Sequence, residues 1–448
     1  MNLFNDLKIR FEQPLWALNP ELALFDTIIE QNPEVVKFIG NDVVKGLKSN
    51  NLGRKDTPTA EQVLRAAVFK EIKKLDYREL ELAMYENLTF KLFMKLDDRI
   101  PFSYSTLQKY ISKISEENIK KIIILINNQA IKEGKESLEK VSPDTTVVET
   151  NVHYPTNNSL IWDCVKTATR LLNQYKDEQK LKKNKDKEDE ENRKRQKRLE
   201  DAKKLNYNIN NEKNKEKQQT LFDTYLKIFD EILTDVKFIL CTERQVNKKL
   251  NELADLLPLA QKVYTNAYRF QMLGEKIENS EKIFSIFEQH TNIIVKGQRE
   301  VEFGHKVMIT RGTSNLILDH EVFEGNPSDK LLYQGTIDNV INNYTIIPHS
   351  TTSDGGFASN LNLEWSAKRG IVNTVFTKVT QSMKNIVESR EIEILLKKWR
   401  SGTEAVISNL KRGFGLQRVV WEGFERFKAK VAWSVLCYNL RVFSNLMI

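Results

Sequence analysis

Two aspartates stand where a carboxylate can take part in chemistry. Asp144 lies in a β-branched segment, and Asp354 stands where a predicted strand ends in a Gly-Gly turn. Phosphodiester cleavage requires activation of water or a sugar hydroxyl and stabilisation of charge on the leaving oxygen. Two divalent ions do both when a few carboxylates converge on them, and Mg²⁺ prefers such hard oxygen ligands. A single aspartate in a sequence is more often a surface residue than a metal ligand. For each of these two aspartates, both interpretations therefore stay open.

A third carboxylate, Glu404, has cationic neighbours on the same helix face. At 3.6 residues per turn, Arg400, Glu404 and Lys411 point within about 40° of one another. A carboxylate flanked by two cations suits a metal ligand whose neighbours grip phosphate. A surface row of salt bridges would show the same spacing, so this pattern also leaves two interpretations.

The elements that must position these residues alternate between strand and helix. We expect a strand over 141–153, a hairpin made of 305–310 and 316–323, a helix over 330–343, strands over 344–349 and 370–377, and helix over 403–443. Two or three strands, a helix, two more strands and a final helix is the order of a ribonuclease-H-like α/β fold. The predicted catalytic domain spans 136–448.

Helix is predicted to interrupt this domain after its first strand, over 159–290. Within this insertion, 176–204 is nearly devoid of apolar residues and interleaves its positive and negative charges. Interleaving favours an exposed helix with i,i+4 pairs over a basic tail. We therefore predict a charged arm over 176–217 that serves as a solvated spacer or contacts the DNA backbone.

The N-terminal part, 1–115, is predicted to be an all-α domain. Thr59 can cap a helix, short helices follow, and Lys109 and Lys113 lie on the surface of an amphipathic segment over 106–114. Short helices ending in a basic one suit a helix-turn-helix DNA-binding unit. A plain helical bundle fits this segment equally well.

Composition sets bounds on the protein's class without naming its function. The 448 residues are 40% apolar and 29% charged, with a net charge of +8, and the length predicts more than one domain. The positive charge makes a polyanionic partner plausible. Three scattered cysteines indicate no disulfide framework and fit a reducing cytoplasm, and no apolar run predicts a membrane span.

Several blocks resemble insertion-sequence DDE transposases. The segment 144–163, beginning DTTVVETNVHYPT, resembles the block that carries their first aspartate, and 351–360 resembles the second-aspartate block. Residues 400–443 are similar to their C-terminal glutamate block, including the Arg-x₃-Glu-x₆-Lys signature, and 282–310 and 318–329 resemble the ISNCY-type branch. Residues 60–114 look like the N-terminal helical domain common in this group.

This resemblance implies a function and a site. Asp144, Asp354 and Glu404 would form the catalytic triad and hold two Mg²⁺ or Mn²⁺ ions. Arg400, Lys411, Lys109 and Lys113 would contact DNA. The partners implied are double-stranded DNA, at the terminal repeats of a mobile element and at its target, and a second copy of the chain when the element ends are paired. The implied location is the bacterial cytoplasm, at the nucleoid.

Two positions depart from the family pattern, and two other functions remain open. Gly355 stands where a basic residue usually follows the second aspartate, and Lys397 replaces a tyrosine that often precedes the arginine. A catalytically silent regulator derived from a transposase could do without the triad. A ribonuclease-H-like nuclease would cut DNA without joining it.

Overall fold

The computed structural model describes residues 15–45, 57–96, 100–180, 188–243, 247–296 and 300–448. The chain divides into two compact units. The first contains 1–151 and 296–448, and the second contains 152–295. Among the described helices, none is long and apolar enough to cross a bilayer.

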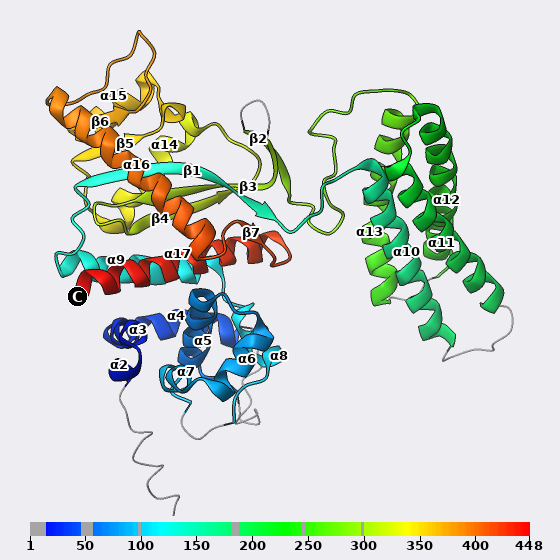
Figure 1. Cartoon of the computed structure of the whole chain (residues 1–448), viewed down its shortest axis with the longest axis horizontal. Helices are drawn as coiled ribbons and strands as arrows, with labels where there is room; N and C mark the ends of the chain where they lie inside the picture. Colours follow the sequence, from blue (N-terminus) through cyan, green and yellow to red (C-terminus); the bar gives the residue numbers. More distant parts are fainter. Residues whose placement is uncertain (1–14, 46–56, 97–99, 181–187, 244–246, 297–299) are drawn as a thin grey trace, which may run out of the picture. The chain divides into compact units, whose positions relative to one another are not determined.

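A mixed sheet forms the centre of the first unit (Figure 1). Within this unit the strand order is β3-β1-β5-β6, with β4 paired to β3 and β7 to β1. β3 runs antiparallel to β1, whereas β5 is parallel to both β1 and β6. The strands are β1 (Lys140–Thr150), β3 (Glu300–Arg311), β4 (Ile317–Phe323), β5 (Ser350–Ser353), β6 (Asn373–Phe376) and β7 (Arg418–Val419).

The two faces of this sheet contribute to different cores because side chains alternate along a strand. In β3, Val307 and Ile309 join the cluster that contains the N-terminal helices and the C-terminal helix. Met308, between them, joins a second cluster. That second cluster includes α14 (Asp329–Tyr344) and α15 (Asn360–Lys368). Helices therefore cover both faces of the sheet.

Helices begin where the sequence offers capping residues. Thr59 caps α5 (Ala60–Lys73), as the sequence predicted, and forms a reciprocal capping box with Gln62. Asp76 and Glu79 do the same at the start of α6. The N-terminal helices are α2 (Leu15–Leu18), α3 (Pro20–Gln31), α4 (Glu34–Val44), α5 (Ala60–Lys73), α6 (Tyr77–Glu86), α7 (Leu88–Phe93), α8 (Tyr104–Ile111) and α9 (Glu116–Lys132).

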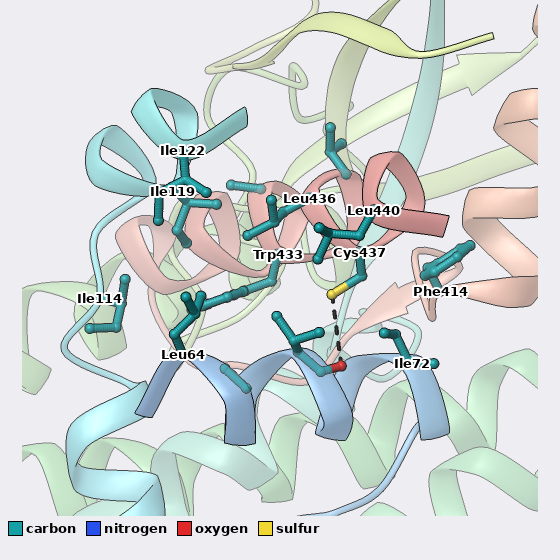
Figure 2. Close-up of a cluster of buried hydrophobic side chains, with 14 of the residues drawn as sticks. Leu64, Ile72, Ile114, Ile119, Ile122, Phe414, Trp433, Leu436, Cys437 and Leu440 are labelled. Atoms are coloured by element: carbon teal, nitrogen blue, oxygen red, sulfur yellow. Dashed lines mark hydrogen bonds between the residues drawn. The ribbon is translucent and has the colours of Figure 1, made fainter. Parts of the chain in front are cut away.

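The C-terminal helix α17 (Phe424–Met447) is the centre of the main core. Figure 2 shows it between α5 and α9, with Trp433 and Leu436 pointing into the cluster. The Cys437 thiol lies 3.9 Å from the carbonyl oxygen of Val68 on α5. The N-terminal helices thus pack on the C-terminal one and belong to the same compact unit as the sheet.

The second unit is mainly a helical bundle that follows β1 in the chain. It contains α10 (Asn157–Lys180), α11 (Glu188–Asn211), α12 (Lys215–Thr242) and α13 (Lys248–Gln271), and β2 (Asn292–Lys296) lies at its boundary. Its core is formed by apolar residues such as Phe222, Phe229 and Leu253.

The predicted charged arm is part of this bundle. Residues 181–187 lie outside the described residues, and the remainder of the charged stretch lies mostly in α11. Lys194 pairs with Glu190 four residues away, as the interleaved charges predicted. Ala202 and Ile209 are buried against neighbouring helices, so α11 packs in the bundle through part of its surface, while many of its charged residues are exposed.

Two other boundaries differ from those the sequence predicted. The strand expected over 344–349 is instead β5, because Tyr344 ends α14 and Thr345 adopts a left-handed cap. The last helical stretch begins earlier than expected, at Arg390, where α16 (Arg390–Gly413) is capped by Ser389. α16 and α17 are separated by β7.

Candidate active site

Asp144 lies within β1, opposite Ile309 of β3. Its side chain is buried, and Oδ1 accepts a hydrogen bond of 2.9 Å from the backbone N–H of Thr145. The second carboxyl oxygen faces α16, the helix that crosses β1 in Figure 1. A buried carboxylate on a strand requires a cationic partner.

Asp354 follows the last residue of β5 and caps the short 3₁₀ turn Gly355–Phe357. Oδ1 accepts hydrogen bonds of 2.7 Å from Gly355 N–H and 2.9 Å from the Thr377 hydroxyl. β5 is parallel to β1 in a register that aligns Val141 with Thr351. Continued along both segments, this register brings Asp354 level with Asp144. The topology therefore places the two aspartates next to each other.

Arg400 of α16 joins two of the acidic residues. Its Nη2 lies 2.7 Å from Asp144 Oδ2, and its Nη1 lies 2.5 Å from Glu404 Oε1. The Arg400 side chain is only 12% exposed, whereas that of Glu404 is 63% exposed. One guanidinium therefore holds a carboxylate of β1 and a carboxylate of α16 next to each other.

The two aspartates have pKa values shifted in opposite directions. Burial raises the pKa of Asp144 to about 6 despite the charge of Arg400, and the charges of Asp354 and Glu404 raise it further. Burial also acts on Asp354, but hydrogen bonds from Gly355 and Thr377 and the charges of Arg400 and Lys378 keep its pKa below the usual value. The charge of Arg400 lowers the pKa of both aspartates, so these residues form one electrostatic unit. We call Asp144, Asp354, Glu404 and Arg400 together the acidic centre.

The helix that carries Glu404 is fixed to the sheet by residues that the sequence did not reveal. Thr403 Oγ1 donates a hydrogen bond of 2.9 Å to Ser142 on β1. The Arg311 guanidinium lies over the Trp399 ring at 3.9 Å and donates to the Trp399 carbonyl at 2.6 Å. A Cβ atom at Gly402 would overlap this guanidinium. A glycine inside a helix costs about 1 kcal/mol relative to alanine, so Gly402 was the available signal of a close approach.

Residues 290–440 match the family model described as a transposase DDE domain. This chain carries a DDE transposase domain. The match includes Asp354 and Glu404 and lies beyond β1, which carries Asp144. No curated protein and no solved structure matches the chain. The domain supports a transposase function of the insertion-sequence type.

Divalent ions are the usual requirement of DDE transposase domains, and the donor set of the acidic centre suits them. Its carboxylates supply hard oxygen ligands. Among the described residues, however, no three acidic, histidine or cysteine side chains stand close enough together to form a ready-made metal cluster. The acidic centre instead contains the Arg400 guanidinium, bonded to two of the carboxylates.

Two departures from the DDE transposase pattern have structural counterparts. Gly355 lies against Lys378, since a Cβ at Gly355 would stand 2.7 Å from the Lys378 Cβ. The Lys378 charge lowers the pKa of Asp354, so a cation acts on the second aspartate from the loop after β6. Lys397, at the position of the usual tyrosine, forms a 2.7 Å ion pair with Glu393 on the same helix.

The other predicted DNA-binding residues lie on two helices. Lys411 is half-buried on α16, beyond Glu404. Lys109 is exposed on α8 and Lys113 follows that helix, with ammonium groups 5.6 and 5.8 Å from the Tyr110 ring.

A groove of about 480 Å³ lies next to α8. Its cations come from α5 and α17, and its aromatic rings are those of Tyr77 and Trp421. The lining also includes two acids, Asp76 and Glu422. Cations interleaved with aromatic rings suit a nucleic-acid backbone and its bases.

Proposed function

We propose that this protein is a transposase that binds the terminal inverted repeats of a mobile element, cuts them and joins them to a target. The catalytic residues in this proposal are Asp144, Asp354 and Glu404. The observation that carries it is the sharing of one guanidinium by Asp144 and Glu404 within reach of the Asp354 charge, in a chain with a DDE transposase domain.

The proposed fold of the catalytic domain, 136–448, is ribonuclease-H-like with a helical insertion. Three features support it. β1 has an antiparallel neighbour on one side and parallel strands on the other. Helices cover both sheet faces, and the α10–α13 bundle follows the first strand. The proposed DNA-recognition region is the N-terminal helical part, 1–115.

The proposed cofactor is a pair of Mg²⁺ or Mn²⁺ ions held by Asp144, Asp354 and Glu404. Such ions, when bound, activate the attacking oxygen and stabilise the leaving one. The protein's own contribution is to fix the ligands. Thr145 and Thr377 orient the two aspartates through hydrogen bonds. The hydrogen bond from Thr403 to Ser142 fixes the position of α16 on the sheet.

Cations near the acidic centre are proposed to hold the DNA backbone. Arg400 and Lys411 lie on the helix that carries Glu404, and Lys378 lies beside Asp354. Guanidinium and ammonium groups bind phosphate oxygens and so position a strand without reading its sequence. Lys109 and Lys113 on the α8 side are assigned to the terminal repeat.

Two copies of the chain are proposed to act together, since two element ends must be cut and joined. The proposed setting is the bacterial cytoplasm, at the nucleoid, where the chain would meet the element and its target. The net charge of +8 is favourable for association with DNA at this location.

The test begins with the DNA on either side of the gene. We expect inverted repeats there, bounded by short direct duplications. A duplex carrying one repeat is then incubated with the full chain, Mg²⁺ and a target plasmid. Isosteric variants Asp144→Asn, Asp354→Asn and Glu404→Gln should each retain less than about a tenth of the cleavage rate, because one ligand supplies several kcal/mol of transition-state stabilisation.

A matched control is Glu391→Gln, which changes an exposed carboxylate on the same helix and should cleave like the unchanged chain. Gel shifts run without divalent ions should show near-normal DNA binding by all four variants, because affinity comes mostly from phosphate contacts elsewhere. Cleavage without joining would support the nuclease alternative. Binding without any cleavage would support the silent regulator.

A further inference from the structure

Arg400 occupies the position in the acidic centre from which a cation reaches all the carboxylates. It forms hydrogen-bonded ion pairs with Asp144 and Glu404, and its charge acts on Asp354. The side chain is 12% exposed, so its positive charge is shared with the carboxylates more than with water. Without this cation, three acidic groups would face one another with much less compensation.

Arg400 uses one oxygen of each of two carboxylates that are proposed to bind a divalent ion. Asp144 presents Oδ2 and Glu404 presents Oε1 to the guanidinium, and Asp144 Oδ1 is already engaged by the Thr145 N–H. A guanidinium and a divalent ion are both cations and repel each other at such short range. Both cannot hold these oxygens at once.

The attachment of Arg400 leaves it able to move. Its Nε atom is buried and has no hydrogen-bond partner among the described residues. Its two ion pairs are therefore the contacts that retain the guanidinium. The Nε atom of Arg311 also has no hydrogen-bond partner among the described residues, but its guanidinium is held by the Trp399 ring and carbonyl and by the Asn315 side chain. The Arg400 side chain has several rotatable bonds and can turn towards solvent when the carboxylates take another cation.

We propose that Arg400 is a displaceable counter-ion that couples metal binding to DNA binding. In the metal-free chain it neutralises the acidic centre and competes with divalent ions. When ions bind to the carboxylates, the guanidinium leaves and becomes available to a DNA phosphate. The proposal rests on the proposed function above and adds a regulation of that site, in which each ligand raises the affinity for the other.

The first experiment measures Mn²⁺ binding to the full chain without DNA, from the electron paramagnetic resonance signal of free Mn²⁺. The variant is Arg400→Gln, and the matched control is Arg412→Gln, since Arg412 is exposed on the same helix and its guanidinium donates to Ser408 in its own turn. We expect Arg400→Gln to bind Mn²⁺ about fivefold tighter or more, and the control to be unchanged. Adding Asp144→Asn should remove the gain.

The second experiment measures binding of a short DNA duplex with and without Ca²⁺, which replaces the catalytic metal. The unchanged chain and Arg412→Gln should bind DNA more tightly with Ca²⁺, by about fivefold or more. Arg400→Gln should lose this increase. Arg400→Lys keeps the positive charge but can pair with fewer carboxylate oxygens, so its Ca²⁺-dependent increase in DNA binding should be intermediate. This variant replaces Arg400→Gln if the glutamine variant does not fold.

Unchanged or weaker Mn²⁺ binding by Arg400→Gln, or an intact Ca²⁺ effect on its DNA binding, would overturn the counter-ion proposal. These results are separate from those that test the function. If the chain cleaves and joins element ends but Arg400→Gln leaves its Mn²⁺ affinity unchanged, only the coupling is refuted. A chain that cleaves nothing refutes the proposed function.

Discussion

Two charge clusters in the first unit have opposite balances of charge. In the first, Glu71 on α5 lies between Lys70, at 3.3 Å, and Lys430 on α17. Lys430 also donates to Ser434 and to the Phe414 carbonyl, at 2.9 and 3.2 Å. In the acidic centre, three carboxylates share the charge of Arg400. One cluster has more cations than anions, and the other has more anions than cations.

The direction of each pKa shift follows from this balance. Glu71 is fully buried, yet the charges of Lys430 and Lys70 outweigh burial and lower its pKa. Asp144 is less buried, and burial together with two acidic neighbours raises its pKa in spite of Arg400. A saturated cluster of this kind stabilises the fold by joining two helices. A cluster short of cations is suited to receive them from outside the chain.

Removing the carboxylate of each cluster should give the largest contrast. Glu71→Gln leaves Lys430 and Lys70 buried without their anion and should lower the free energy of unfolding by about 3–5 kcal/mol. Glu404→Gln removes an exposed partner and should cost less than about 1 kcal/mol. Urea denaturation measures both. If both variants lost the same free energy of unfolding, the distinction between a structural and a functional cluster would be wrong.

The pH dependence of stability should have opposite signs at the two clusters. The raised pKa of Asp144 means that its contribution to stability is complete at low pH and is lost as the pH rises through about 6. The lowered pKa of Glu71 means the reverse, with stability lost as the pH falls below the usual carboxyl range. The free energies of unfolding of the metal-free chain and of Asp144→Asn should diverge by up to about 3 kcal/mol as the pH rises through this range. Thermal denaturation at several pH values measures both.

Adding Mn²⁺ at neutral pH should largely reverse the destabilisation caused by ionised Asp144, because the ions bind only the ionised form. The Asp144→Asn variant should gain little from the same addition. A constant difference in stability between the two proteins from pH 4 to pH 8 would contradict the assigned pKa.

The support beneath α16 should be sensitive to a single methyl group. Gly402→Ala places a Cβ against the Arg311 guanidinium, so the helix or the arginine must shift. Overpacking of this kind costs about 1–3 kcal/mol, although alanine is otherwise the better helix former. Cleavage should fall as well, since Glu404 and Arg400 move with the helix. The control is Gly335→Ala on α14, where a Cβ would meet no atom within 4 Å.

Local patterns predicted most of the secondary structure. The Thr59 cap, the 305–323 hairpin and the helix after Ser328 lie close to where periodicity and capping place them. The helix α9 was not predicted, although its isoleucines fill the core beside α17. The start of β5 was misplaced because Tyr344–His349 has strand propensity, whereas in the structure Tyr344 ends α14 and Thr345 adopts a left-handed cap.

The candidate site was predictable only in part, for a similar reason. Its acidic residues could be named from strand ends, helix spacing and family resemblance. The ion pairs of Arg400 were not visible, because they depend on how α16 crosses β1. We predicted a DNA contact for Arg400, and the structure shows it bonded to carboxylates. The DNA role of this arginine is therefore proposed only for the metal-loaded state.

The smallest expected effect concerns DNA recognition, away from both charge clusters. Lys109 is exposed on α8, and Lys113 lies just beyond it, near the same Tyr110 ring. If each binds one phosphate, Lys109→Ala and Lys113→Ala should weaken DNA binding a few-fold and reduce the slope of log affinity against log salt by about 0.9 each. Stability and metal binding should not change, because neither side chain is part of a buried cluster.

The full chain is the proper material for this last comparison. The apolar side of α5 packs on α17, so a fragment limited to residues 1–115 would expose part of the main core. Lys121→Ala is the matched control, since Lys121 is an exposed lysine on α9 that pairs with Glu117. Repeat and scrambled duplexes are compared at several salt concentrations. If the slopes of Lys109→Ala and Lys113→Ala equal that of the control, α8 does not face DNA. The region of DNA contact would then have to lie elsewhere, and the bundle of 152–295 would be the next candidate.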